Sequence, residues 1–222
     1  MSNADLQDLV ARVVVVAVML LVAFPVHEAA HAYAAYRLGD STARLFGRLS
    51  LDPIVHFDPI GGGLLAVSVL LTGLGFGWAK PTPVNPYNLR GQHGDAIVSA
   101  AGPISNLGLA IVGAVIFRIV VAVGLTSGDA AVFVLNVLGF FVEINLLLMI
   151  FNLLPIPPLD GSKVLYSFLD PRTAAQVRPV LDQYGIILLL FAALFPIFGG
   201  NTLLGAVYDA FVFPATNLLL GL

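Results

Sequence analysis

The chain of 222 residues contains no cysteine and few charged residues. Without cysteine, disulfides, thiolate metal sites and thiol nucleophiles are excluded, so any metal must be bound by His, Asp, Glu or Asn. Charged residues make up 10% of the sequence and the net charge is −3, and no basic cluster is present, which argues against a nucleic-acid partner. With 59% hydrophobic residues and a mean hydropathy of +0.96, the composition predicts a polytopic membrane protein.

Long apolar runs predict an all-α membrane fold with about five transmembrane helices. The runs over 13–36, 96–117 and 130–159 are each long enough to cross ~30 Å of hydrocarbon. The first follows an acidic start and lacks a cleavage site, so we interpret it as a retained span. Runs over 186–198 and 203–220 predict a C-terminal helical hairpin within 184–222, although the number of spans after Tyr184 stays open. We expect one membrane-embedded domain over 1–222, with a catalytic core at about 9–165.

The distribution of lysine and arginine predicts the orientation, because these residues accumulate in cytoplasmic loops. It puts the N-terminus and the 124–131 link outside, and the segments after the first and third spans inside. The region 58–94 must then enter and leave on the cytoplasmic face. Its Gly-rich part, 61–74, is too short to cross and is predicted to be re-entrant, as either a helix or a β-hairpin.

The run over 13–36 contains His27-Glu28-Ala29-Ala30-His31. On a helix the two histidines are four residues apart and share one face. This is the H-E-x-x-H spacing in which both imidazoles bind zinc and the glutamate acts as general base. Polar contacts between helices would be the structural alternative, but three ionisable side chains in an apolar span favour the metal site.

A zinc site needs a further protein ligand, for which Glu143 and Asp160 compete. Asp160 follows a Pro-rich break at the cytoplasmic end of its span and matches His27 and His31 in depth, whereas Glu143 is nearer the bilayer centre. We therefore predict His27, His31 and Asp160 as ligands. His56 and His93 lie in polar loops and are expected to be solvated.

These motifs resemble the site-2 protease family of intramembrane zinc metalloproteases. The resemblance rests on H-E-x-x-H, on N-x-x-P-x-x-P-x-D-G over 152–161, and on A-G-P-I-S-N over 101–106. The segment G-F-G-W-A-K-P-T-P-V-N-P over 75–86 is similar to the compact, stand-alone prokaryotic branch. No PDZ or CBS domain is recognisable.

The resemblance implies one zinc ion per chain, held by His27, His31 and Asp160, with Glu28 as the catalytic base. It implies cleavage of a single-span membrane protein, as in regulated intramembrane proteolysis, by a multi-pass protein of a bacterial or archaeal cell membrane with its active site toward the cytoplasm. Asn152 is expected to bind substrate or the oxyanion. Asn106 either lines the active-site wall or makes a structural hydrogen bond near the start of its helix. Gly61, Gly62 and Gly63 are expected to offer a backbone edge to the unwound substrate.

A secondary transporter or metal permease with a broken-helix site is the alternative function. Such folds usually have paired repeats with matching breaks, and the breaks near 61–83 and 155–158 are unlike each other. A catalytically dead scaffold would be expected to lose Glu28 or a ligand. The sequence leaves open the substrate, any requirement for a prior cut, the gate and the oligomeric state.

Overall fold

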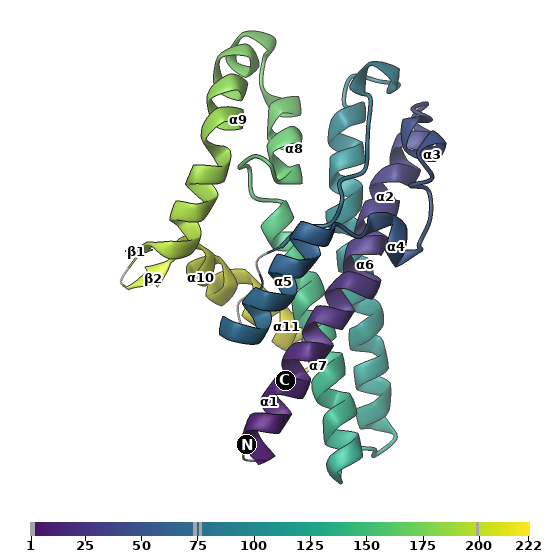
Figure 1. Ribbon diagram of the computed structural model, residues 1–222, viewed down its shortest axis with the longest axis vertical. Helices are drawn as coiled ribbons and strands as arrows, with labels where there is room; N and C mark the ends of the chain where they lie inside the picture. The colour runs from purple at the N-terminus through teal and green to yellow at the C-terminus, as the bar shows by residue number, and fades with distance from the viewer. Residues whose placement is uncertain (1–2, 73–74, 76, 199) are drawn as a thin grey trace.

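The structure is a computed structural model that describes residues 3–72, 75, 77–198 and 200–222. It is an elongated helical assembly in which the N-terminus and the α6–α7 link lie at one end, and the α8–α9 link lies at the other (Figure 1). The all-α prediction is confirmed. In the described chain, five helical stretches are long and apolar enough to cross a membrane: Leu9–Arg37, Gly94–Ala122, Asp129–Asn152, Pro171–Leu194 and Leu203–Leu220.

The first stretch is continuous from α1 (Asn3–Val18) through a π-turn, η1 (Met19–Ala23), into α2 (Phe24–Arg37). The π-turn directly precedes Phe24-Pro25, where the proline supplies no N–H to the carbonyl one turn earlier. The same arrangement recurs in the last stretch, where α10 (Leu203–Val207) and the π-turn η3 (Tyr208–Val212) lead into Phe213-Pro214 at the start of α11 (Phe213–Leu220). Each proline is thus accommodated by a local widening of the helix.

The centre of the fold is α6 (Gly94–Ala122), which packs against α2 on one side and α7 (Asp129–Asn152) on the other. Close approach of α6 and α7 depends on Gly113, where a Cβ would lie 2.7 Å from Cδ1 of Phe141. A buried cluster around Ala110, Val142 and Leu146 joins α6 and α7 to the C-terminal stretch. This packing fixes α2 and α7 relative to each other and therefore positions the site described below.

The Gly-rich segment is a short helix, α5 (Pro59–Thr72). The N–H of Lys80 donates to the carbonyl of His56, at 2.8 Å, so the chain returns to the level at which it left. Residues 73, 74 and 76 lie outside the described residues. This return agrees with the predicted re-entrant path, and the β-hairpin alternative is wrong for Pro59–Thr72.

Two arginines cap the C-terminal ends of two helices. Arg12 donates to the carbonyls of Val69 and Leu70 at the end of α5, at 3.2 and 3.1 Å. Arg118 donates to the carbonyls of Leu218 and Leu219 at the end of α11, at 2.6 and 2.7 Å. The last carbonyls of a helix lack intrahelical partners and carry its negative dipole end. Both arginines therefore stabilise helix ends that would otherwise expose open carbonyls.

Short elements connect the spans. Two helices, α3 (Thr42–Leu45) and α4 (Pro53–His56), precede α5, and the 3₁₀ turn η2 (Pro86–Asn88) precedes α6. After α7 come α8 (Asp160–Phe168), α9 (Pro171–Leu194) and a two-stranded antiparallel pair, β1 (Pro196–Phe198) with β2 (Asn201–Thr202). Helix α9 begins at Pro171, before the predicted start of the C-terminal hairpin near 184, and is capped by Asp170.

Candidate metal centre and active site

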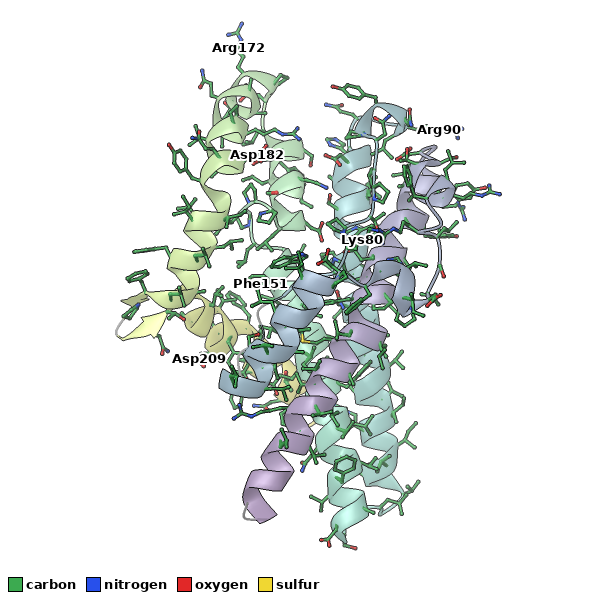
Figure 2. The ribbon with its side chains drawn as sticks, viewed as in Figure 1. Lys80, Arg90, Phe151, Arg172, Asp182 and Asp209 are labelled. Carbon is green, nitrogen blue, oxygen red and sulfur yellow. The ribbon has the colours of Figure 1, made fainter. Side chains whose placement is uncertain are left out.

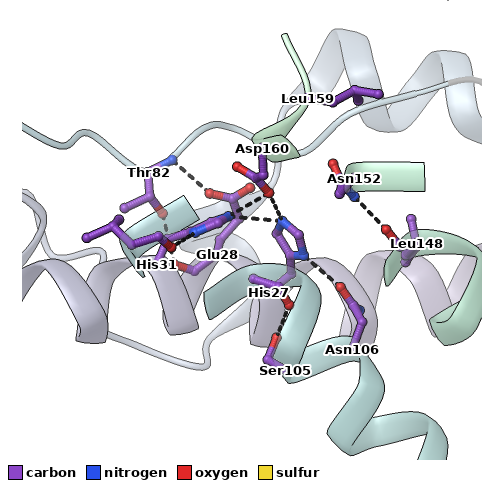
Figure 3. Close-up of polar contacts among 12 residues, drawn as sticks. His27, Glu28, His31, Thr82, Ser105, Asn106, Leu148, Asn152, Leu159 and Asp160 are labelled. Carbon is purple, nitrogen blue, oxygen red and sulfur yellow. Dashed lines mark hydrogen bonds and ion pairs between the residues drawn. The ribbon is translucent and has the colours of Figure 1, made fainter. Parts of the chain in front are cut away.

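His27 and His31 lie one turn apart on α2 and direct their imidazoles toward Asp160, the first residue of α8 (Figure 3). The two Nε2 atoms are 3.0 Å apart, and Oδ2 of Asp160 lies 3.2 Å from each of them. Both histidines are buried. The structure therefore brings together the three predicted ligands, and they form the single metal-ligand cluster found among the described residues.

In each imidazole, the hydrogen-bond partner of Nδ1 determines whether Nε2 is free to accept or to bind a metal. Nδ1 of His31 lies 2.7 Å from the carbonyl of Val98, which can only accept, so this nitrogen carries the proton. Nδ1 of His27 lies 2.6 Å from Oδ1 of Asn106. In the neutral rings both Nε2 atoms are then acceptors that face each other and a carboxylate oxygen. Three converging acceptors need a cation between them.

The spacing of these acceptors fits zinc. Tetrahedral ligands about 2.0–2.1 Å from a zinc ion are separated by roughly 3.3 Å, close to the separations of 3.0 and 3.2 Å seen here. Two imidazoles and one carboxylate are a common catalytic ligand set, which leaves a fourth position for water.

Gly102 on α6 keeps the space beside both imidazoles open. A Cβ at this position would lie 2.4 Å from Nε2 of His31 and 2.6 Å from Nε2 of His27. Sequence reasoning noticed the A-G-P run but assigned no role to this glycine. Its role follows from the packing of α6 against α2, which no local pattern predicts.

The Pro-rich break delivers Asp160 to the histidines. Helix α7 ends at Asn152, the chain turns through Pro155, Pro157 and Pro158, and α8 begins at Asp160. Gly161 permits this return, because a Cβ there would lie 2.2 Å from the carbonyl oxygen of Leu153. Gly185 on α9 similarly abuts the carbonyl of Pro157. The Asp-Gly pair thus combines a ligand with the small residue that lets it approach.

Glu28 lies beside the three ligands and is held by Thr82 from the returning segment (Figure 3). The N–H of Thr82 donates to Oε2 of Glu28 at 2.8 Å, and its hydroxyl donates to the backbone carbonyl of Glu28 at 3.0 Å. Thr82 stands between Pro81 and Pro83, neither of which has an N–H. Sequence reasoning missed Thr82, although the P-T-P run isolates a single backbone donor.

Asp40, just beyond α2, anchors the same segment. It is fully buried and accepts from the N–H of Asn85, the amide of Asn88, and the N–H and hydroxyl of Thr42. Burial raises the pKa of Asp40, but these hydrogen bonds outweigh it and hold the pKa below its usual range. Residues 82–88 are therefore tied to α2 at Glu28 and to the residues just beyond α2 at Asp40.

The predicted substrate-binding residues are placed differently from one another. Asn152 donates to the carbonyl of Leu148 at 2.9 Å and keeps a second amide hydrogen on the same nitrogen. Asn106 lies behind His27 with no exposed surface, not on an open wall. Roles for both residues in binding substrate stay predictions.

We expected Gly61, Gly62 and Gly63 to offer a backbone edge, and the structure corrects this expectation because the three residues are helical. These residues form the first turns of α5, and Asp58 accepts from the N–H of Gly61 through its side chain and of Gly62 through its carbonyl. A Cβ would meet the carbonyl oxygen of Trp78 at Gly61 and the ring of Phe57 at Gly62, whereas Gly63 has open space. Two of the glycines thus permit close packing, and their N–H groups are used within the fold.

The other candidates lie apart from the metal centre. Glu143 accepts from the hydroxyl of Tyr208, which joins α7 to the C-terminal stretch. His56 is buried and contacts the carbonyl of Ser50 at 2.8 Å, so the expectation of a solvated side chain is wrong there. His93 is exposed just before α6, as expected.

Comparison with known proteins agrees with this geometry. The family model of Peptidase family M50 matches residues 118–192. The chain is 39% identical over 184 residues to "Putative zinc metalloprotease YwhC" of Bacillus subtilis (strain 168), covering 81% of this chain and 80% of that protein. The chain belongs to peptidase family M50, the site-2 protease family.

Further M50 relatives include "Putative zinc metalloprotease Rip2" of Mycobacterium tuberculosis (strain ATCC 25618 / H37Rv), 31% identical over 86% of this chain and 70% of that protein. The Rip2 protein of Mycolicibacterium smegmatis is 32% identical over 79% of this chain and 65% of that protein. No solved structure matches the chain. Family membership and the five apolar helices together make this M50 chain a multi-pass membrane metalloprotease.

Proposed function

We propose that this protein is an intramembrane zinc endopeptidase that hydrolyses peptide bonds in or near the transmembrane segment of single-span membrane proteins, as in regulated intramembrane proteolysis. One observation carries the proposal: the acceptors of His27, His31 and Asp160 converge beside Glu28 within an apolar helical bundle. Isolated ionisable groups are costly inside a bilayer, so a cluster of four requires a function.

The ligand set supports one zinc ion per chain, bound by His27, His31 and Asp160. Zinc bound there would supply positive charge that acidifies water and polarises a peptide carbonyl. Glu28 takes the proton from the attacking water and passes it to the leaving amine. Thr82 holds the carboxylate of Glu28 in place for both transfers. Asn152 has an amide hydrogen with which to stabilise charge that develops on the carbonyl oxygen.

The depth of the site supports a cut near one face of the membrane. His27 and His31 fall in the second half of the Leu9–Arg37 stretch, and Asp160 follows the end of α7. Arg90 and Arg172 lie toward this end of the molecule (Figure 2). By the distribution of positive charge this end faces the cytoplasm of a bacterial or archaeal cell, so we place the site toward the cytoplasmic side of the cell membrane.

The test compares zinc content and proteolysis in purified protein. Glu28→Gln should keep zinc and lose cleavage of a panel of single-span substrates, because it removes the base and no ligand. Asp160→Ala should lose both, whereas Glu143→Ala should keep zinc. Metal-dependent solute flux in proteoliposomes without cleavage would favour a transporter and overturn the proposal. Retention of zinc in Asp160→Ala, with loss in Glu143→Ala, would overturn the ligand assignment.

A further inference from the structure

A chain of hydrogen bonds runs from the backbone of α7 through α6 to the imidazole of His27. Nδ2 of Asn145 donates to the carbonyl of Phe141 at 2.8 Å. Oδ1 of Asn145 accepts from Nδ2 of Asn106 at 3.1 Å, and Oδ1 of Asn106 lies 2.6 Å from Nδ1 of His27. Both asparagines are fully buried, so water does not compete for their amides.

The carbonyl of Phe141 sets the direction of every bond in this chain. A backbone carbonyl can only accept, so the amide nitrogen of Asn145 must face it and the oxygen of Asn145 must face Asn106. Asn106 must then present its nitrogen to Asn145 and its oxygen to His27. The oxygen of Asn106 can only accept, so Nδ1 of His27 carries the proton.

We propose that Asn145 and Asn106 are positioning residues that hold His27 in its Nδ1–H tautomer and so keep Nε2 free for the metal. The inference rests on the proposed function only in taking His27 as a zinc ligand. His31 obtains the same result in one step, because its Nδ1 faces the carbonyl of Val98 directly. Each histidine is thus controlled by a backbone carbonyl, one directly and the other through two amides.

The alternative is that the two asparagines only join α6 to α7, since polar side chains commonly hydrogen-bond between membrane helices. The two roles differ in what they change. A joining role affects stability. A positioning role affects the tautomer of His27 and the affinity for zinc, since loss of a group that orients a metal-binding histidine typically costs 10- to 100-fold in affinity.

The experiment measures zinc affinity and the tautomer of His27 in detergent-purified protein. Zinc affinity is obtained by competition with a chelator for wild type, Asn145→Leu, Asn106→Leu and Asn106→Asp. The tautomer is obtained from ¹⁵N spectra of histidine ring nitrogens in metal-free protein. The sequence has only 4 histidines, and His27→Gln assigns the signal. Asn136→Leu is the matched control, because Asn136 lies on the same helix but lines a different cavity beside Glu143 and Tyr208.

We expect Asn145→Leu and Asn106→Leu to bind zinc about 10- to 100-fold more weakly, with signals of both His27 tautomers. Asn106→Asp retains an acceptor beside Nδ1 but loses the N–H that donates to Oδ1 of Asn145, so it should keep the Nδ1–H tautomer and lose less zinc affinity than Asn106→Leu. Wild-type affinity and an unchanged tautomer in Asn145→Leu would overturn the proposal. Equal losses in Asn106→Asp and Asn106→Leu would also overturn it, as a packing effect. Zinc affinity and the His27 tautomer can both be measured in protein that does not cleave any substrate, so this test is independent of the test for proteolysis.

Discussion

Replacing Gly102 with alanine tests whether the zinc site depends on the close approach of α6 to α2. The added methyl carbon would lie 2.4 and 2.6 Å from the two Nε2 atoms, whereas a relaxed contact needs about 3.5 Å. The backbone of α6 is fixed by its packing against α2 and α7, so the imidazoles must move. Overpacking of this kind costs about 1–3 kcal/mol.

If the methyl group occupies the space at the Nε2 atoms, the arrangement of the two histidines that binds zinc is destabilised by this free energy. It corresponds to zinc affinity about 5- to 150-fold weaker, since ~1.4 kcal/mol is a factor of ten. Zinc competition titration measures this loss, together with thermal unfolding in detergent.

Gly108→Ala is the matched control, because Gly108 lies on the same helix with nothing within 4 Å of its Cβ position. That variant should keep zinc affinity and gain a little stability, since alanine is the better helix former by about 1 kcal/mol. Wild-type zinc affinity in Gly102→Ala would refute the reasoning, because the methyl group would then have been accommodated without moving the ligands.

Three further predictions concern the segments around the site. Thr82→Pro removes the N–H that holds Glu28, a bond worth about 1.5–3 kcal/mol, so kcat should fall about 10- to 100-fold with zinc content unchanged. Thr82→Val keeps the N–H and should lower kcat less, and an equal loss of kcat in the two variants would contradict this role. Single cysteines at the exposed positions Leu45 and Tyr87 should react with an impermeant reagent from one side of the membrane, and one at Thr126 from the other. If Leu45 and Tyr87 react from opposite sides, α5 is not re-entrant. Arg12→Met should lower the free energy of unfolding by about 1–3 kcal/mol through the open carbonyls of α5, and an unchanged value would show that the cap contributes nothing.

The metal ligands could be predicted because their arrangement is mostly local. The spacing of His27 and His31 alone puts both on one face of a helix. Because ionisable side chains are costly in an apolar span, a metal site is favoured over polar contacts between helices. Asp160 required one long-range step, which the depth of the Pro-rich break supplied. The M50 resemblance pointed the same way, and the structure brings all three together.

The groups that orient the ligands could not be predicted, because they come from helices packed across the site. Gly102, Asn145 and Thr82 act through contacts between segments that are distant in sequence. Periodicity shows that such a residue is buried but not what it faces. Asn145 in particular could equally have joined two helices.

The sequence does not decide the secondary structure of α5, because its composition and its environment favour different answers. Three consecutive glycines disfavour a helix in water, by about 1 kcal/mol each relative to alanine. At membrane depth the cost of unpaired backbone groups is several kcal/mol each, and a helix pairs most of them within itself. The environment therefore outweighs the propensity, and the segment is helical.

The capping of α5 explains how a helix can end at membrane depth. Asp58 accepts from its first N–H groups, and Arg12 donates to two of its last carbonyls. Arg118 satisfies the end of α11 in the same way. Because the N-terminus and the 124–131 link are predicted to lie outside, Arg12 and Arg118 fall near the outer face, where lysine and arginine are normally scarce. Because each has a helix end to cap, their positions are explained by local electrostatics and do not weigh against the orientation derived from the remaining cations.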